Sequence, residues 1–315
     1  MTLALLNPLP GYAEPDVDEV RGKVETLYHK AEQASERFNE ARVAREAAQT
    51  RLRTLRADLT RQVKRHEEIR DQVAAALVQD YQGQALSTTS QVVLSDDPDA
   101  FLEQLSAVSA FNDQRGAMMA DFTVEAKQLE IRRAAAKEEL AALAELEKTL
   151  ADEQAEIDVN AAEAEELLEE LEARAAAAAA PSRSGTRTAA APAPANVPVS
   201  GRAKAAVDFA LAQVGDAYVW GAAGPDAYDC SGLTMKAWAA AGVSLPHSSS
   251  GQMSSTTPVT TSDLQPGDLV FYYSPVSHVG MYIGNGQIVD AANPSTGVRI
   301  AGLHSMPLVG AGRPG

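Results

Sequence analysis

The sequence predicts a small α+β domain at the C-terminus, preceded by a long all-α antiparallel coiled-coil hairpin. Three observations lead to this prediction. A three-four rhythm of apolar residues runs through most of residues 15–178. Residues 179–200 are rich in Pro, Ala, Ser and Thr, which is typical of a linker. Residues 201–315 then combine helical patterns with short β-type runs, and this stretch is long enough for its own core.

Composition excludes several classes of function. The net charge of −16 makes nucleic acid an unsuitable partner. Most of this charge belongs to the coiled coil, because residues 201–315 carry only seven acidic and five basic residues. The single cysteine, Cys230, excludes an intramolecular disulfide and a cysteine-rich metal site. No segment reaches the ~20 apolar residues of a transmembrane span.

Residues 1–13 resemble the end of a secretory signal peptide. They contain a short apolar patch, prolines, and the small residues Gly11 and Ala13 at positions −3 and −1 of a cleavage site before Glu14. The basic start of such a signal is missing and the apolar run is short. We expect a secreted, cell-envelope protein, and an ordinary disordered N-terminus is the alternative.

Residues 15–178 are expected to form two long helices that fold back on each other. An intermolecular dimer is the alternative, and the sequence does not separate the two. Residues 83–121 interrupt the rhythm and are expected to form a helical insert at the tip, with Asp97 as N-cap and Pro98 in the first turn. The apolar rhythm is carried by Val20, Val24, Leu27, Ala31, Ala34, Phe38, Ala41, Ala48, Leu52, Leu55, Leu59, Ile69 and Val73, and later by Phe122, Ala126, Leu129, Ala136, Leu140, Leu143, Leu150, Ile157, Ala164, Leu168 and Leu171.

Cys230 lies where a Gly/Ala/Pro-rich loop gives way to a predicted helix over residues 231–241. Asp229 is a suitable N-cap for this helix. A thiol in the first turn faces free N–H groups and the positive end of the helix dipole, which favours the thiolate. The Asp229 carboxylate acts in the opposite direction. An inert buried thiol is the alternative interpretation.

A cysteine nucleophile needs a histidine base and a group that orients the base. His278 opens an apolar strand, residues 279–283, and Asp290 lies on the return strand after Gly284-Asn285-Gly286. A three-residue loop places both side chains on one face and leaves a fully apolar opposite face. Asp290 would then lie across from Gly280, whose missing side chain leaves room for a diagonal contact with His278.

Five motifs in order resemble the NlpC family of papain-like cell-wall endopeptidases. The resemblance covers residues 203–312 and implies a papain-like fold, with Cys230 as nucleophile, His278 as base and Asp290 as the third polar residue. Many relatives carry His at the last position, and many carry Arg where His247 stands, so the role of His247 stays open. The motifs are Tyr218-Val-Trp-Gly221, Asp229-Cys-Ser-Gly-Leu233, Leu245-Pro-His-Ser-Ser-Ser-Gly-Gln252, Pro266-Gly-Asp-Leu-Val-Phe271 and His278-Val-Gly-Met-Tyr-Ile-Gly-Asn-Gly286.

The resemblance implies hydrolysis of peptidoglycan stem peptides, between D-Glu or D-isoglutamine and the diamino acid, without a cofactor or metal. It implies substrate contacts for Tyr218, Asp229, Ser231 and Ser249, although caps and core packing explain these residues equally well. A coiled coil, a linker and such a domain occur together in secreted septal hydrolases. This resemblance implies that a division-linked, FtsEX-like membrane complex recruits the coiled coil, and that the coiled coil restrains the enzyme until the complex binds.

Other functions remain open at this point. A papain-like amidase or acyltransferase would use the same residues. If the C-terminal domain has lost its catalytic activity, the protein would instead be a coiled-coil division adaptor. A cytosolic coiled-coil scaffold would require residues 1–13 not to be a signal remnant. Nucleotide, zinc-peptidase and serine-hydrolase functions have no matching motif, since the sequence contains no Gly-rich phosphate loop, no His-Glu-x-x-His and no Gly-x-Ser-x-Gly.

Overall fold

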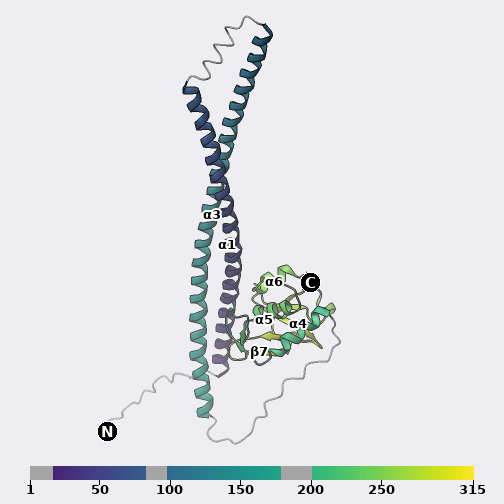
Figure 1. Ribbon diagram of the computed structural model, residues 1–315. Helices are drawn as coiled ribbons and strands as arrows, with labels where there is room; N and C mark the ends of the chain where they lie inside the picture. Colours follow the sequence, from purple (N-terminus) through teal and green to yellow (C-terminus); the bar gives the residue numbers. More distant parts are fainter. Residues whose placement is uncertain (1–16, 83–97, 179–200) are drawn as a thin grey trace, which may run out of the picture. The chain divides into compact units, whose positions relative to one another are not determined.

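The computed structural model describes residues 17–82, 98–178 and 201–315 (Figure 1). The expectations for residues 1–13, for residues 83–97 of the predicted insert and for the linker at 179–200 lie outside these ranges. The chain divides into two compact units. Unit 1 contains the chain up to Ala44 together with Glu147–Gly315, and unit 2 contains Arg45–Leu146.

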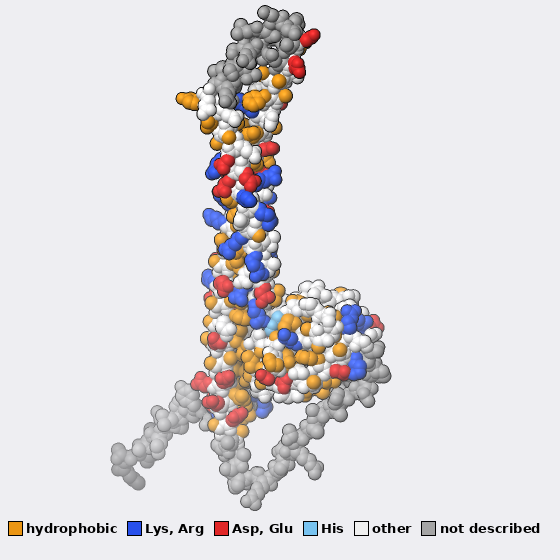
Figure 2. All heavy atoms as spheres, in the orientation of Figure 1, with side chains coloured by type: hydrophobic (Ala, Val, Ile, Leu, Met, Phe, Trp, Pro, Cys, Tyr) orange, Lys and Arg blue, Asp and Glu red, His pale blue; other side chains and the backbone are white. Residues whose placement is uncertain are grey.

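Two long helices confirm the predicted antiparallel hairpin. Helix α1 spans Val17–Tyr81 and helix α3 spans Pro98–Ala178. In unit 2, three ion pairs join the two helices. The residue numbers of these pairs increase along α1 and decrease along α3, so the helices are antiparallel. These pairs join Arg51 to Glu139 at 2.8 Å, Arg132 to Asp58 at 2.5 Å and Arg65 to Glu125 at 2.8 Å. Figure 2 shows acidic and basic side chains interspersed along these helices.

Residues 98–121 differ from the expected separate insert, because they continue into the second long helix without a break. The only glycine in this stretch is Gly116, and a Cβ there would meet nothing within 4 Å. A single helical glycine costs only about 1 kcal/mol relative to alanine, and no proline follows Pro98 in the helix. Nothing in this stretch is therefore strong enough to end the helix.

In unit 1 the two helices bury an apolar seam. Val24, Leu27 and Tyr28 of α1 form a buried cluster with Ala164 of α3, and Trp220 of the C-terminal domain packs against this cluster. Arg37 bonds Glu153 at 2.9 Å and Glu156 at 2.8 Å, in the same antiparallel sense. None of the helices in the described ranges is long and apolar enough to cross a membrane.

The C-terminal domain of unit 1 is an α+β fold, which confirms the predicted class. Its main sheet has six strands in the order β3-β8-β4-β5-β6-β7, with antiparallel pairing throughout. The helices are α4 (Gly201–Ala212), α5 (Cys230–Ala240) and α6 (Ser249–Ser255), with a 3-10 turn at Thr261–Asp263. The strands are β1 (Ala217–Tyr218), β2 (Ala227–Tyr228), β3 (Thr257–Pro258), β4 (Leu269–Tyr272), β5 (His278–Gly284), β6 (Gln287–Ala291), β7 (Val298–Gly302) and β8 (Leu308–Arg313).

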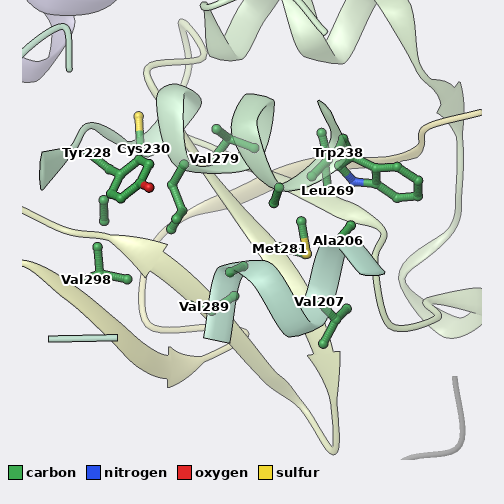
Figure 3. Packing of buried hydrophobic residues seen from close by; sticks show 14 of the residues in the cluster. Ala206, Val207, Tyr228, Cys230, Trp238, Leu269, Val279, Met281, Val289 and Val298 are labelled. Carbon is green, nitrogen blue, oxygen red and sulfur yellow. The ribbon is translucent and has the colours of Figure 1, made fainter. Parts of the chain in front are cut away.

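Helices α4 and α5 cover one face of this sheet and enclose the main core. Figure 3 shows Cys230 at the edge of the core, with its sulfur pointing away from the other labelled side chains. The Trp238 indole anchors α5, because its N–H donates to the carbonyl of Gly267 at 3.1 Å. The core contains Ala206, Val207 and Ala210 of α4, Leu233, Ala237 and Trp238 of α5, and Val279, Met281, Ile283, Val289 and Ala291 of the β5–β6 hairpin.

The β5–β6 hairpin has the predicted register. Met281 pairs with Val289 and Tyr282 with Ile288, and a bulge shifts the register only next to the turn. A Cβ on Gly280 would lie 2.8 Å from Cδ1 of Ile288 but 3.5 Å from the Cβ of Asp290, an ordinary contact, so the glycine makes room for Ile288 rather than for Asp290 as expected. This register therefore places His278 and Asp290 on the same face of the hairpin.

Candidate active site

Cys230 is the first residue of α5, and Asp229 is its N-cap as predicted. The Asp229 Oδ1 accepts from the backbone N–H of Gly232 at 2.6 Å. The space around this turn is tight, since a Cβ on Gly232 would lie 2.2 Å from the carbonyl oxygen of Ala222. The helix start is therefore fixed against the preceding loop, and the thiol is held in the first turn.

His278 has an acidic partner at each ring nitrogen. Nε2 lies 3.0 Å from Asp290 Oδ2, and Nδ1 lies 2.5 Å from Glu32 Oε1. Arg299 Nε donates to the other Asp290 oxygen at 3.2 Å. Because an ionised carboxylate only accepts hydrogen bonds, both ring nitrogens of His278 donate, and the ring is an imidazolium in this conformation.

Cys230 and His278 lie close to each other. The Cys230 thiol, a ring nitrogen of His278 and a carboxylate oxygen of Glu32 all lie within 4.8 Å of one another. The three predicted catalytic residues are thus brought together by three different elements, α5, β5 and β6. The structure adds a fourth participant that the sequence did not identify, a carboxylate from α1.

Four polar residues of α1 face the site and form what we call the polar stripe: Glu32, Glu36, Asn39 and Arg42. Steps of four, three and three residues place them on one side of the helix. Glu32, Glu36 and Asn39 are buried. Buried polar side chains of this kind need partners, and the C-terminal domain supplies them.

Glu36 makes the densest set of these contacts. Its Oε1 accepts from Ser231 Oγ at 2.8 Å and from the Cys230 thiol at 3.5 Å. Its Oε2 accepts from the backbone N–H of Ser249 at 2.5 Å and from Ser249 Oγ at 2.6 Å. One carboxylate is therefore held by four donors beside the only thiol of the chain.

His247 belongs to a neighbouring network. Its Nε2 lies 2.8 and 2.9 Å from the two Asp229 oxygens, and its Nδ1 faces the Arg42 guanidinium. Since Arg42 can only donate, His247 accepts at Nδ1 and donates to Asp229 from Nε2. Asn39 Nδ2 also donates to Asp229, at 2.9 Å. Asp229 thus caps α5 and joins two residues of the polar stripe to the site.

The surroundings raise the pKa values of the catalytic pair. Burial acts to lower the pKa of His278, but the Glu32 charge and the hydrogen bonds to Asp290 and Glu32 outweigh it and raise the value to about 10. Burial, followed by the charges of Glu36, Glu32 and Asp229, raises the pKa of Cys230 well above its usual range. This conformation therefore holds a protonated thiol beside an imidazolium.

Two carboxyl groups shift in opposite directions. Burial and the nearby Asp229 charge raise the pKa of Glu36 from 4.5 to about 7, against the bonds from Ser249 and Ser231. Burial acts to raise the pKa of Asp290, but the bond and charge of His278 and the Arg299 charge lower it below 3.8. Asp290 is thus a fixed anion behind the imidazole, whereas Glu36 titrates near neutrality.

The predicted substrate-binding residues surround the thiol. Ser231 and Ser249 both hold the Glu36 carboxylate, and Asp229 lies one residue before Cys230. Tyr218 is buried, and its hydroxyl has no hydrogen-bond partner among the described residues. The geometry therefore gathers all four around one site.

Access to the thiol is closed in this conformation. Cys230 is 1% exposed, and Glu36 fills the space between its thiol and Ser249. A peptide carbonyl has no route to the sulfur while the polar stripe is in place. The arrangement is a buried thiol, beside a histidine, that carboxylates from the same chain cover.

Sequence reasoning missed the polar stripe because Glu32, Glu36 and Asn39 occupy ordinary solvent-facing positions of the heptad pattern. Asn39 follows Phe38 within a helix, where Asn has a low helix propensity, and this was the one available signal. The partners lie some 200 residues away along the chain, so no local pattern could pair them.

Residues 215–308 match the NlpC/P60 family. A probable endopeptidase of Corynebacterium glutamicum is 46% identical over 110 residues, which cover 35% of this chain and 53% of the relative. The probable endopeptidase p60 of Listeria monocytogenes is 47% identical over 106 residues, covering 32% of this chain and 22% of that protein. The match thus spans about half the length of the first relative, and less of the second.

A solved structure, the NlpC/p60 domain of the peptidoglycan hydrolase SagA, is also similar. It is 30% identical, covers 35% of this chain and 97% of that chain, and has a TM-score of 0.33.

Proposed function

We propose that this chain, whose C-terminal domain belongs to the NlpC/P60 family, is a cysteine endopeptidase that cleaves peptidoglycan stem peptides. The observation that carries the proposal is the meeting of Cys230 with His278, whose other nitrogen bonds Asp290 at 3.0 Å. A nucleophile, a base and an orienting carboxylate in this order are the elements of a hydrolase triad.

The proposed chemistry runs in two halves. The Cys230 thiolate attacks the amide carbonyl carbon, and the His278 imidazolium gives its proton to the departing amine as the C–N bond breaks. His278 then takes a proton from water, the hydroxide attacks the thioester carbon, and the C–S bond breaks to release the acid. Asp290 holds the ring throughout. The backbone N–H of Cys230 at the start of α5 is a suitable donor to the oxyanion.

The bond proposed for cleavage lies between D-Glu, or D-isoglutamine, and the diamino acid. Ser231 and Ser249 support the recognition of an acidic group next to this bond, because both already hold the Glu36 carboxylate. The Tyr218 hydroxyl offers an unused hydrogen bond, and Asp229 offers an acceptor. In this proposal Glu36 occupies the position of a substrate carboxylate.

We propose that the coiled coil restrains the enzyme through the polar stripe. Glu32 takes the ring nitrogen of His278 that would otherwise face the thiol, and Glu36 covers Cys230. Hydrolysis then requires the stripe to leave the site. This proposal explains why carboxylates are buried at a nucleophile whose pKa they raise.

We further propose secretion into the cell envelope and recruitment by an FtsEX-like division complex. The apolar side chains exposed where α1 ends and α3 begins are candidates for this contact (Figure 2), among them Leu77, Val78, Leu102, Leu105 and Met119. Binding of such a partner to the hairpin would supply the free energy that withdraws the stripe.

The proposal is tested by product analysis of a variant that lacks the two carboxylates of the polar stripe. The Glu32→Ala/Glu36→Ala variant of the full chain is incubated with purified muropeptides, and the products are identified by mass spectrometry. We expect a new N-terminal diamino acid, and no product when Cys230→Ala is added. An acyl-transfer product or cleavage at the L-Ala amide would favour the amidase or acyltransferase alternative. Loss of all activity with the fold intact would favour a catalytically inactive coiled-coil adaptor. The proximity of Cys230, His278 and Asp290 argues against this alternative.

A further inference from the structure

Among the residues that the structure describes, Glu32, Cys230 and His278 form the one group that could hold a metal ion. A carboxylate oxygen, a sulfur and a ring nitrogen lie within 4.8 Å of one another, and all three side chains are buried. Zinc is the ion that this mixed set of oxygen, sulfur and nitrogen donors suits best, and three protein ligands of these types are common in its sites.

The distances are compatible with a tetrahedral ion after small side-chain shifts. Zinc bonds of about 2.0–2.3 Å place ligand atoms roughly 3.3–3.6 Å apart. The Glu32 oxygen and His278 Nδ1 are now 2.5 Å apart and would separate by about 1 Å when an ion replaces the proton between them. Glu36 Oε1 lies 3.5 Å from the sulfur, but it accepts from Ser231 Oγ at 2.8 Å and is not one of the three mutually close ligand atoms.

The groups behind these ligands already have the arrangement that zinc sites use. Asp290 bonds His278 Nε2 at 3.0 Å, which leaves Nδ1 to face the ion and fixes the ring. Ser231 and Ser249 hold the two oxygens of Glu36, which fixes this carboxylate beside the thiol. Carboxylate–histidine pairs of this kind orient metal ligands.

Charge favours a cation here. Glu32, Glu36, Asp229 and Asp290 bring four carboxylates into the buried region, where the cationic groups are the His278 imidazolium, Arg299 on Asp290 and Arg42 beside His247. Buried anions of one sign are costly unless a cation compensates them. A divalent ion would take the place of the two protons on Cys230 and His278, so it would supply the same two positive charges that this anionic region already holds.

We propose that the closed form of this chain binds one zinc ion between α1 and the C-terminal domain, through Glu32, Cys230 and His278. The consequence for regulation rests on the proposed function. An ion bound only when the polar stripe is in place would stabilise the closed form increasingly as the free ion concentration rises above its Kd, and it would block the nucleophile and the base together.

The test uses the metal-free full chain and reads binding without substrate. Zinc is titrated against a colorimetric zinc indicator, and cobalt(II) is added separately to detect a thiolate-to-cobalt absorption band. We expect one zinc per chain and a cobalt band that disappears in Cys230→Ser. Glu32→Gln should weaken zinc binding at least tenfold, in the range seen for loss of a metal-site partner. The matched control Glu46→Gln, an exposed residue of the same helix, should bind as the parent does.

Absence of stoichiometric binding, or binding unchanged in both Glu32→Gln and Cys230→Ser, would overturn the proposal. Binding lost in Cys230→Ser but retained in Glu32→Gln would also overturn it, because the ion would not bridge the helix to the domain. Helical circular dichroism of each variant checks that the fold is kept. Failure here leaves muropeptide cleavage by the Glu32→Ala/Glu36→Ala variant in EDTA unaffected, so the two proposals fail separately.

Discussion

The Glu36 carboxylate accepts a hydrogen bond from the thiol of Cys230 at 3.5 Å. A residue of the N-terminal helix thereby contacts the proposed nucleophile of the C-terminal domain, and the thiol is buried in this conformation. This contact distinguishes a covered enzyme from a free one, and several measurable properties depend on it.

The first is the reactivity of Cys230 toward a small alkylating agent. Replacing Glu36 with Ala removes four hydrogen bonds to a carboxylate, each of which is worth on the order of 1.5–3 kcal/mol. We expect iodoacetamide to label Cys230 at least tenfold faster in Glu36→Ala than in the parent chain, measured by mass spectrometry in EDTA at pH 7. Glu46→Ala is the control, and equal labelling of all three proteins would show that Glu36 does not cover the thiol.

The second is the pH dependence of closure. The pKa of His278 is raised to about 10 in the closed form, and the part of this rise that Glu32 causes is lost on opening, so the contribution of His278 to closure is present at neutral pH and is lost as pH rises through 10. The pKa of Glu36 is raised from 4.5 to about 7, so ionising it in the closed form opposes closure increasingly from pH 4.5 to 7. Both pKa shifts make the closed form less stable, relative to the open form, as pH rises.

Trp220 reports this change, because it packs against Val24, Leu27 and Tyr28 of the helical seam. Between pH 6 and 10, in EDTA, we expect its fluorescence to move toward that of the Glu32→Ala/Glu36→Ala variant. The variant itself should show a flat profile. A parent profile that is also flat, or one that moves in the opposite direction, would contradict the assignment of these two groups.

The third concerns Asp290. In the Glu32→Ala/Glu36→Ala background, Asp290→Asn should lower kcat by roughly 10²–10⁴, because an amide no longer stabilises the imidazolium or fixes its tautomer. KM should change little, since Asp290 lies behind the ring and bonds Arg299 on its other side. A loss confined to KM would mean that Asp290 serves substrate binding instead.

The fourth is a stability contrast between two helical glycines. Gly232→Ala places a Cβ 2.2 Å from the carbonyl oxygen of Ala222, so we expect the domain to lose about 1–3 kcal/mol of unfolding free energy. The Cβ that Gly116→Ala adds has no atom within 4 Å beyond the neighbouring helix backbone, so this substitution should instead stabilise α3 by about 0.5–1 kcal/mol. Urea unfolding followed by Trp238 fluorescence for the first and by circular dichroism for the second checks the signs, and a stable Gly232→Ala would show that the turn before Cys230 is not tightly packed.

Much of the site could be predicted because its rules are local. Asp229 caps α5 and Cys230 begins it, since capping is set by the residues next to the helix. The β5–β6 register followed from the period of two along a strand and from the length of the turn, which together decide whether His278 and Asp290 share a face. The packing of the α1–α3 seam followed from the heptad pattern in the same way.

What could not be predicted depends on contacts between distant parts of the chain. Strands β7 and β8 carry weak alternation, and their identity follows only from pairing with β6 and β4. Helix α6 has only seven residues and is built from Ser, Gly, Gln and Met, so propensity alone does not predict it. Glu32 and Glu36 look like solvent-facing helix residues until the peptidase domain is placed against them.

The most direct test of the central claim is the rate at which three full-length proteins cleave the same muropeptide: the parent, Glu32→Ala/Glu36→Ala, and that variant with Cys230→Ala. We expect slow cleavage by the parent, cleavage at least tenfold faster by the double variant, and none by the triple variant. Equal rates for the parent and the double variant would contradict restraint by the polar stripe, and cleavage by the triple variant would contradict the assignment of Cys230 as the nucleophile.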